Sequence, residues 1–321
     1  MDIFRKLEAA AKRKKKTIIL PESNDPRVIA AAKIILRKKL AKLILIDTGK
    51  GIKLPEHDGL DIIDIGFSEQ FAGEYKDLKN KKDKGFTLAD AEKALTDPLL
   101  FACMLLKNNY ADAVVAGSVY STGNVLRSAI QTVGLSKGNR TVSSFFLMNF
   151  PKGNKFSNKV FAYGDCGVLP NPTAEQLSDI AIQTSRNFKK LTGIKPRTAF
   201  LSFSTKGSAK DVSTVKVLKA LHLTQKHAPG LLCDGEVQFD TAFIPDVAKR
   251  KDPESKLKGA ANVFIFPDLN SGNIAYKITE RIGGAVATGP IVQGLAQPVM
   301  DLSRGCNASD FVNMSIIASL Y

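Results

Sequence analysis

The sequence has few of the side chains that bind transition metals or form disulfides. Its four cysteines lie more than sixty residues apart, no CxxC pair occurs, and its three histidines form no ligand spacing with them. These residues are Cys103, Cys166, Cys233, Cys306, His57, His222 and His227. The pattern argues against a zinc site or a disulfide framework and predicts reduced thiols in a cytoplasmic protein.

Long apolar runs are absent as well. No stretch reaches the ~18 residues that a membrane span needs, and residues 1–16 lack the apolar core of a secretory signal. That segment instead predicts an amphipathic helix with Phe4, Leu7 and Ala11 on one side. Neither GxGxxG nor GxxxxGK(S/T) occurs, which disfavours a standard dinucleotide site or a P-loop.

Acidic residues are comparatively few. The net charge is +15, and residues 1–50 hold nine of these charges. The basic runs at 12–16 and 37–42 have no interleaved aromatics or glycines and form no DNA-binding motif, so no nucleic-acid partner is expected. Solvated helix faces and helix C-termini explain them better. The excess charge can still raise the arrival rate of polyanionic small molecules.

What is present is a repeated alternation of short apolar runs and helical patterns. We expect strands at 17–22, 42–47, 61–66, 111–117, 143–150, 159–165, 197–204, 262–268 and 285–292, mostly separated by helices. Such strands predict an α/β fold with mainly parallel sheets covered by helices on both faces. The length predicts two such three-layer domains that meet at a cleft. The boundary is expected near residue 150, where 151–159 is typical of a linker or hairpin.

Polar turns follow several of the expected strands. Ser121 and Thr122 open a helix that carries Arg127, and Ser204 and Thr205 begin the turn before another helix. In parallel sheets ligands bind beyond the carboxyl ends of the strands. Small hydroxyls, glycines and free backbone N–H groups at such turns favour anions. The pattern therefore predicts a substrate that carries phosphate.

The turn at 301–312, DLSRGCNASDFV, has two interpretations. In the structural one, Asn307 caps the last helix, Asp310 completes a capping box, and Arg304 pairs with Asp301. In the functional one, Arg304 binds an anion or a polarised carbonyl, Ser303 donates a hydrogen bond, and Asp310 abstracts a proton. A thiol near a helix N-terminus, here Cys306, can be a nucleophile, but no histidine is near it in sequence, and a small buried residue is the better explanation.

At these residues the sequence closely resembles the phosphate acetyltransferases (phosphotransacetylases), of the phosphate acetyl/butyryl transferase family. The similarity extends over essentially the whole chain. It is carried by LPESNDPRV (20–28), YSTGNVLRSAIQTVG (120–134), AYGDCGVLPNPTAEQL (162–177), LSFSTKGSAKD (201–211), DGEVQFDTAF (234–243), FPDLNSGNIAYK (266–277) and GPIVQGLAQPVMDLSRGC (289–306).

The resemblance implies reversible transfer of an acetyl group between coenzyme A and inorganic phosphate. It implies small-molecule substrates, no tightly bound cofactor, no metal and a homodimer. It also implies that the active-site cleft lies between the two α/β domains and that the C-terminal helix returns to the first domain. We therefore expect a discontinuous first domain, 1–150 plus 300–321, and a second domain at 151–299.

The resemblance also assigns roles to single residues. Asp310 corresponds to the proposed general base, Arg304 to the arginine that binds and polarises acetyl phosphate, and Ser303 to a serine at the reacting group. Arg127 matches an arginine linked to substrate binding, with Ser121 and Thr122 in the loop beside it. Lys81 stands where the family often has an arginine, and lysine lacks the bidentate fork of arginine.

Three alternatives remain at this point. A longer acyl group such as butyryl would keep the mechanism and change the substrate. A catalytically silent protein that binds anions or nucleic acid would use the basic N-terminal region. A covalent route through Cys306 would give ping-pong kinetics.

Overall fold

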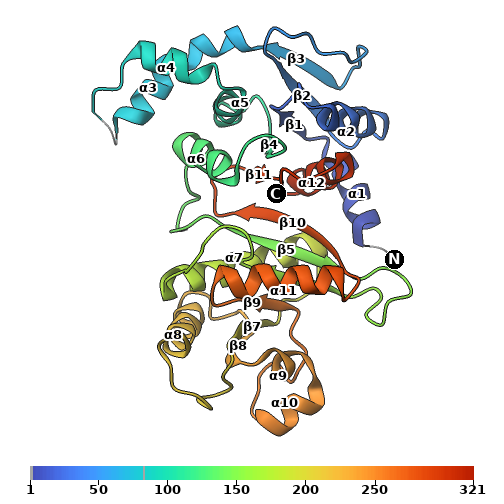
Figure 1. Cartoon of the computed structure of the whole chain (residues 1–321), viewed down its shortest axis with the longest axis vertical. Coiled ribbons are helices and arrows are strands. Elements are labelled where there is room, and N and C mark those ends of the chain that lie inside the picture. Colours follow the sequence, from blue (N-terminus) through green and yellow to red (C-terminus); the bar gives the residue numbers. More distant parts are fainter. Residues whose placement is uncertain (1–2, 82–83) are drawn as a thin grey trace. The chain divides into compact units, whose positions relative to one another are not determined.

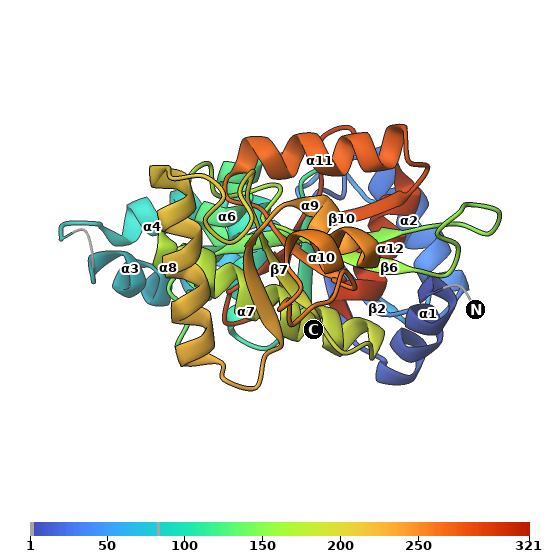
Figure 2. The ribbon, with the colours of Figure 1, turned by 90° about the horizontal axis from the view of Figure 1, so that it is seen from below.

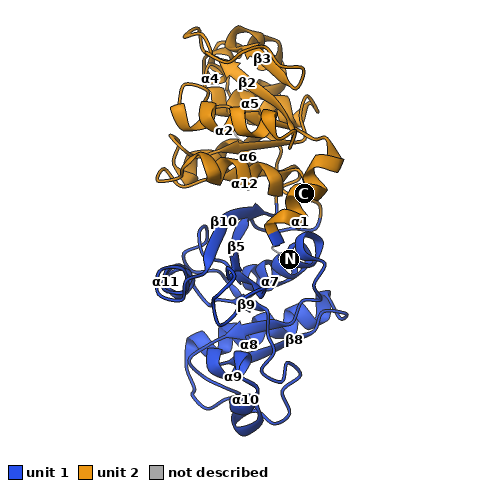
Figure 3. Ribbon diagram, turned by 90° about the vertical axis from the view of Figure 1, so that its right-hand side faces the viewer, with its two compact units in different colours: residues 1–3, 138–294 blue, residues 4–137, 295–321 orange. Residues whose placement is uncertain are grey.

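The computed structural model describes residues 3–81 and 84–321, which form two compact units (Figures 1 and 3). Unit 2 contains residues 4–137 and 295–321, and unit 1 contains Ile3 and residues 138–294. The chain therefore leaves unit 2 once and returns to it. In the structure the chain passes between the units after residues 137 and 294, earlier than the expected 150 and 300. The first boundary is earlier because strand β5 (Ser143–Asn149) pairs with strands of unit 1.

Unit 2 has a five-stranded sheet in the order β11–β4–β1–β2–β3, and all its neighbouring strands are parallel. Two of its inner strands, β1 and β4, are apolar and almost wholly buried, as expected where helices cover both faces. The strands are β1 (Thr17–Leu20), β2 (Lys42–Asp47), β3 (Leu60–Asp64), β4 (Ala113–Ala116) and β11 (Val299–Asp301).

Helices cover both faces of this sheet. On one face α2 (Pro26–Arg37) packs against α12 (Ala308–Ala318), which also contacts β4 and β11. On the other face α5 (Pro98–Lys107) contacts β1 and β4, and α6 (Thr122–Thr132) contacts β11 (Figure 1). The predicted N-terminal helix is α1 (Ile3–Lys14).

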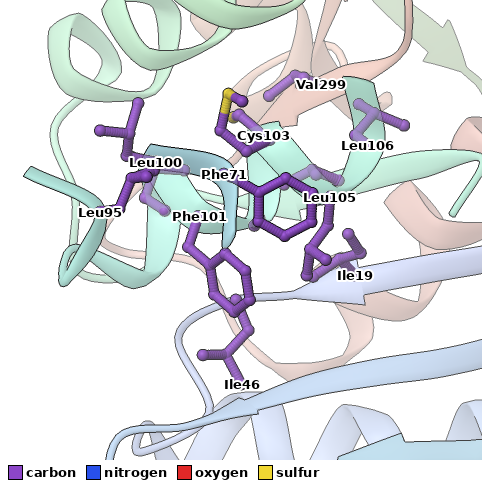
Figure 4. Packing of buried hydrophobic residues seen from close by; sticks show 14 of the residues in the cluster. Ile19, Ile46, Phe71, Leu95, Leu100, Phe101, Cys103, Leu105, Leu106 and Val299 are labelled. Carbon is purple, nitrogen blue, oxygen red and sulfur yellow. The ribbon is translucent and has the colours of Figure 1, made fainter. Parts of the chain in front are cut away.

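One hydrophobic core of unit 2 lies between the sheet and α5. Residues Leu99–Leu106 of α5 are all buried, because this helix is apolar on every side. Phe71, Phe101 and Ile19 pack together there (Figure 4). The surrounding elements are η1 (Ile65–Phe71), α3 (Ala72–Asn80) and α4 (Leu88–Leu95).

Unit 1 has a six-stranded sheet in the order β10–β5–β6–β9–β7–β8. Strands β6, β9, β7 and β8 are parallel to one another, whereas β10 and β5 are antiparallel to their neighbours. Residues 151–159 connect β5 to β6 as a hairpin, which is one of the two roles expected for that segment. The strands not yet given are β6 (Val160–Gly164), β7 (Thr198–Leu201), β8 (Cys233–Val237), β9 (Val263–Ile265) and β10 (Val286–Gln293).

Five helices accompany the sheet of unit 1. Figures 2 and 3 show α7 (Ala174–Thr192) and α11 (Leu269–Arg281) on opposite sides of it. Helix α8 (Val212–His227) packs on α7, while α9 (Phe239–Phe243) and α10 (Pro245–Lys251) follow β8. The predicted α/β class, with mainly parallel sheets flanked by helices, is confirmed in both units. Within residues 3–81 and 84–321, no helix is long and apolar enough to cross a membrane.

Candidate active site

Three loops meet beyond the carboxyl ends of β1, β4 and β11, which are neighbours in the parallel sheet of unit 2. They are residues 21–25, 117–121 and 302–307. This is the edge of the sheet at which a ligand site is expected. The turn identified in the sequence at 301–312 therefore lies beside the Ser121–Thr122 loop.

The loop after β4 is organised by Glu22. This buried carboxylate accepts hydrogen bonds from the backbone N–H groups of four successive residues, 117–120, at 2.7–3.0 Å, and from the Ser118 hydroxyl at 2.8 Å. Successive N–H groups of this kind form an anion-binding nest. The nest that the sequence suggested for a substrate anion is thus filled by a side chain of the protein.

Arg27 ties the same three loops together. Its guanidinium forms an ion pair with Asp25 at 2.6 Å and donates to the Ser118 carbonyl at 2.9 Å. It also donates to the carbonyls of Arg304 and Cys306, at 2.8 and 2.9 Å. The turn after β11 is therefore held in place by a residue of α2, through a rigid fork with fixed geometry.

The turn itself presents Ser303 and Arg304 on the surface of unit 2. Both residues are exposed, and Ser303 Oγ accepts a hydrogen bond from the Gly305 N–H at 3.2 Å. Within the part of the chain that the structure describes, the Arg304 guanidinium has no ion-pair or hydrogen-bond partner. Its backbone is fixed by Arg27 while its cationic group is free to bind an anion.

Helix α12 begins with the predicted capping box. The Asn307 side chain accepts from the N–H groups of Ser309 and Asp310, and Asp310 Oδ2 accepts from the Asn307 N–H at 2.9 Å. The structural interpretation of these two residues is confirmed. It leaves Asp310 Oδ1 without a hydrogen bond among the described residues, so one carboxylate oxygen remains available to accept a proton.

Cys306 is buried beneath this turn, 7% exposed. Burial raises the pKa of its thiol to about 11, with the Arg27 charge acting in the opposite direction and the Asp310 charge raising it further. At that value roughly one thiol in ten thousand is ionised at neutral pH. This environment suits a packed core thiol and disfavours a nucleophile.

The expected pairing of Arg304 with Asp301 is wrong. Asp301 ends β11 with its side chain in the interior, 1% exposed, and Oδ2 accepts a hydrogen bond from the Thr122 hydroxyl at 2.6 Å. Arg304 lies beyond the following turn on the surface, out of reach of that interior site. Ser121 is the N-cap of α6 and accepts from the Asn124 N–H at 3.3 Å.

Arg127 lines a pocket of about 460 Å³ between α3 and α6. Its guanidinium is exposed and makes a single long contact, 3.5 Å, to Asn124 Oδ1. Lys79 lies in the same pocket, and the sequence did not point to it. Lys81 is exposed at the C-cap of α3, outside the residues that line the pocket.

Ser204 and Thr205 belong to unit 1, where their hydroxyls make internal hydrogen bonds. Ser204 Oγ donates to Glu236 Oε1 at 2.8 Å, and Thr205 Oγ1 accepts from the Gln238 N–H at 3.0 Å. Glu236 also accepts from the Gly207 N–H at 2.8 Å. As substrate-binding residues both remain predictions, since a substrate would have to replace or extend these bonds.

Comparison with known proteins identifies the family of this chain. Residues 2–319 match the family described as "Phosphate acetyl/butaryl transferase". The chain belongs to this family. A phosphate acetyltransferase of Acetivibrio thermocellus is 46% identical over 326 residues, covering 100% of this chain and 98% of the relative. One of Thermoanaerobacterium thermosaccharolyticum is 42% identical, covering 98% and 97%.

The fold is also similar to that of a solved structure. A phosphotransacetylase from Streptococcus pyogenes superposes with a TM-score of 0.91 at 36% identity, covering 99% of this chain and 97% of the other. As a member of the phosphate acetyl/butyryl transferase family, the chain is an acyltransferase. Among the described residues, no group of three or more His, Cys, Asp or Glu side chains could hold a metal ion.

Proposed function

We propose that this acyltransferase moves an acetyl group reversibly between coenzyme A and inorganic phosphate. The observation that carries the proposal is the turn after β11, which presents Ser303 and Arg304 and leads into α12 at Asp310. The similar proteins of Acetivibrio thermocellus and Thermoanaerobacterium thermosaccharolyticum are both named phosphate acetyltransferases. Their names favour acetyl over the longer butyryl group.

In the proposed reaction, Asp310 takes the proton from the coenzyme A thiol. A free thiol is only a few per cent ionised at pH 7, so a positioned carboxylate raises the supply of thiolate. The free Oδ1 of Asp310 supports this role, because Oδ2 is held by the helix cap. The thiolate attacks the carbonyl carbon of acetyl phosphate, the C–S bond forms, and the C–O bond to phosphate breaks.

Charge that develops during this attack needs a donor nearby. Arg304 is the candidate, because its guanidinium has no partner within the described residues and its backbone is anchored by Arg27. Ser303 provides a hydroxyl beside it. Loss of one such donor typically lowers the rate by ~10²–10³. We therefore expect the Arg304→Gln variant to fold and to have a kcat lower than wild type by ~10²–10³.

Coenzyme A carries several phosphates, and α6 supplies the groups to bind them. Arg127 projects into the pocket between α3 and α6, where Lys79 adds a second positive charge. Ser121 and Thr122 stand at the N-terminus of the same helix, where anions are favoured. We propose that these residues, with Lys81 nearby on α3, bind coenzyme A.

Direct transfer is preferred to a covalent route through Cys306. The thiol is buried and its pKa is raised to about 11. The proposed steps use only the two substrates and side chains of the protein, with no tightly bound cofactor.

The first test is the rate of acyl-CoA formation from coenzyme A and acetyl phosphate, measured beside butyryl phosphate. Preference for acetyl supports the proposal, preference for butyryl changes the substrate, and absence of turnover with both rejects it. A tight complex with generic DNA at physiological salt would instead favour the silent anion-binding alternative.

The second test is Asp310→Asn. Asparagine can still accept the Asn307 N–H and preserve the capping box, so the variant should fold and lose most of its kcat. Asp90→Asn is a matched control, since Asp90 has the same capping role at the start of α4, facing Thr87. A near-wild-type rate for Asp310→Asn would reject the assignment of the base.

We also propose that the enzyme is a homodimer and that an apolar face of unit 1 forms the contact. Ile274, Ile278 and Ile282 succeed one another at intervals of four along α11 and its C-cap, 57%, 52% and 83% exposed. The last two line a 440 Å³ pocket with several phenylalanines. Apolar patches of this kind mark interaction sites, and a twofold dimer needs one self-complementary patch. Ile278→Glu should shift the molar mass in solution toward a monomer; an unchanged mass rejects this face.

A further inference from the structure

Asp301 is a buried acid to which the proposed chemistry gives no part. It is the last residue of β11, it pairs in register with Ala116 of β4, and only 1% of it is exposed. Ser303 follows two residues later. Burying a carboxylate is unfavourable unless its oxygens are hydrogen-bonded, so its contacts need an explanation.

One oxygen of Asp301 is engaged and the other is not. Oδ2 accepts the Thr122 hydroxyl at 2.6 Å, whereas Oδ1 is buried without any hydrogen-bond partner. Gly117 makes room for this group: a Cβ at position 117 would lie 2.6 Å from Oδ1 and 2.3 Å from the Leu302 carbonyl oxygen. Gly117 also has φ +110°, which side-chain-bearing residues rarely adopt.

These contacts link two parts of the candidate site. Thr122 is the first residue of α6, the helix that carries Arg127, and Asp301 is continuous with the Ser303–Arg304 turn. We propose that Asp301 is a positioning residue for acyl transfer, which through Thr122 fixes the start of α6 against β11 and the catalytic turn. The inference rests on the function proposed above.

The charge of Asp301 supports a role beyond packing. Burial raises the pKa of its carboxyl to about 7, the Thr122 hydrogen bond lowers it, and the Glu22 charge raises it. Strand β4 contributes no ionisable group (Ala113–Ala116). The three surrounding loops contribute Glu22 and Asp25 after β1, Tyr120 after β4, and Arg304 and Cys306 after β11. The adjacent helices add Arg27 on α2, Arg127 on α6 and Asp310 on α12.

The strength of the link therefore depends on pH near neutrality. A hydrogen bond to an ionised carboxylate is shorter and roughly twice as strong as one to a neutral group. As Asp301 loses its proton, the bond from Thr122 strengthens and the start of α6 is held more firmly. A residue that only packed the interior would give no such dependence.

The test is the pH profile of kcat for acetyl-CoA formation, in wild type, Asp301→Asn and Thr122→Val. We expect the wild-type kcat to rise through an ionisation near pH 7, at about the pKa of Asp301. Asp301→Asn keeps the size and the acceptor but should lose that rise. Thr122→Val should lower kcat about tenfold to a hundredfold, as for a small misplacement of the site, and Thr122→Ser should restore it.

Thr132→Val is a matched control, because Thr132 is also a buried hydroxyl of α6 but does not reach the candidate site. It donates to the Ser128 carbonyl of its own helix at 2.7 Å and contacts the Cys103 thiol of α5. It should keep the wild-type kcat and profile. If Asp301→Asn has the wild-type kcat and its kcat still rises near pH 7, the inference about Asp301 is overturned, while the proposed function stands. A wild type without transacetylase turnover overturns the proposed function, and the inference with it.

Discussion

Glu22 offers the sharpest test of how the candidate site is built. Its carboxylate accepts four backbone N–H groups and one hydroxyl from residues 117–120 while only 7% exposed. Glu22→Ala removes the acceptor and leaves five donors facing an empty space. A buried donor without a partner costs about 1–3 kcal/mol. If water satisfies all but two of them, the free energy of unfolding falls by about 2–6 kcal/mol.

Glu22→Gln separates charge from shape. The amide keeps one accepting oxygen but turns an NH₂ group toward N–H donors, which cannot pair with it. We expect a loss of about 1–3 kcal/mol, smaller than for alanine. Glu56→Gln is the control, since Glu56 is exposed and its substitution should change stability by less than about 0.5 kcal/mol.

Urea unfolding followed by circular dichroism gives the overall loss. The two units can unfold in separate steps, so amide hydrogen exchange should localise the effect. The N–H groups of residues 117–120 should exchange faster in Glu22→Ala. A variant with wild-type stability and protected amides at 117–120 would refute the view that this carboxylate holds the loop.

Three further predictions follow from the same site. Arg27→Ala should lower kcat at least about tenfold, because it releases the carbonyls of Arg304 and Cys306. Arg37→Ala, at an exposed position, is the control, and equal kcat values for the two variants would contradict the role of Arg27 in holding the turn. Cys306→Ala should keep most activity and show no ping-pong kinetics, since the thiol pKa is raised to about 11; loss of turnover would revive the covalent route. The folded-state pKa of Asp301, about 7, exceeds its ordinary 3.8, so the folded protein holds a proton that the unfolded chain has released. The contribution of Asp301 to stability should therefore fall as pH rises from about 4 to about 7, by on the order of 4 kcal/mol, and it is measured as the change with pH of the difference between wild type and Asp301→Asn in urea titrations.

Most of the strands that the sequence predicted have uninterrupted apolar runs; the predicted strand at 61–66, which corresponds to β3, is the exception because it contains Asp61 and Asp64. Those at 17–22, 42–47 and 111–117 correspond to β1, β2 and β4, which are buried on both faces. Two strands had no such signal. β11 has three residues, too few for a periodicity, and β8 (Cys233–Val237) contains two acidic residues although all of it is buried.

The polar sequence of β8 is compatible with burial because its charges have partners far away in sequence. Lys206 pairs with Asp234, and Ser204 donates to Glu236. A pattern of apolar residues cannot reveal such partners. The same limit applies to the site, where Arg27 reaches Arg304 and Cys306 across 277 and 279 positions of the chain. The capping box at Asn307 and Asp310 was predictable because its contacts are local.

Two anion-binding turns expected from the sequence are occupied by the protein itself. Glu22 fills the nest after β4, and Glu236 accepts the Gly207 N–H after β7. Asp165 likewise accepts three N–H groups of the loop after β6, a turn that the sequence did not suggest. Glycine, serine and threonine in such turns are equally suited to an internal carboxylate and to a phosphate. Free backbone amides at these two turns therefore do not by themselves identify a substrate site. The proposed role of Arg304 rests instead on an exposed guanidinium that has a fixed backbone and no partner among the described residues.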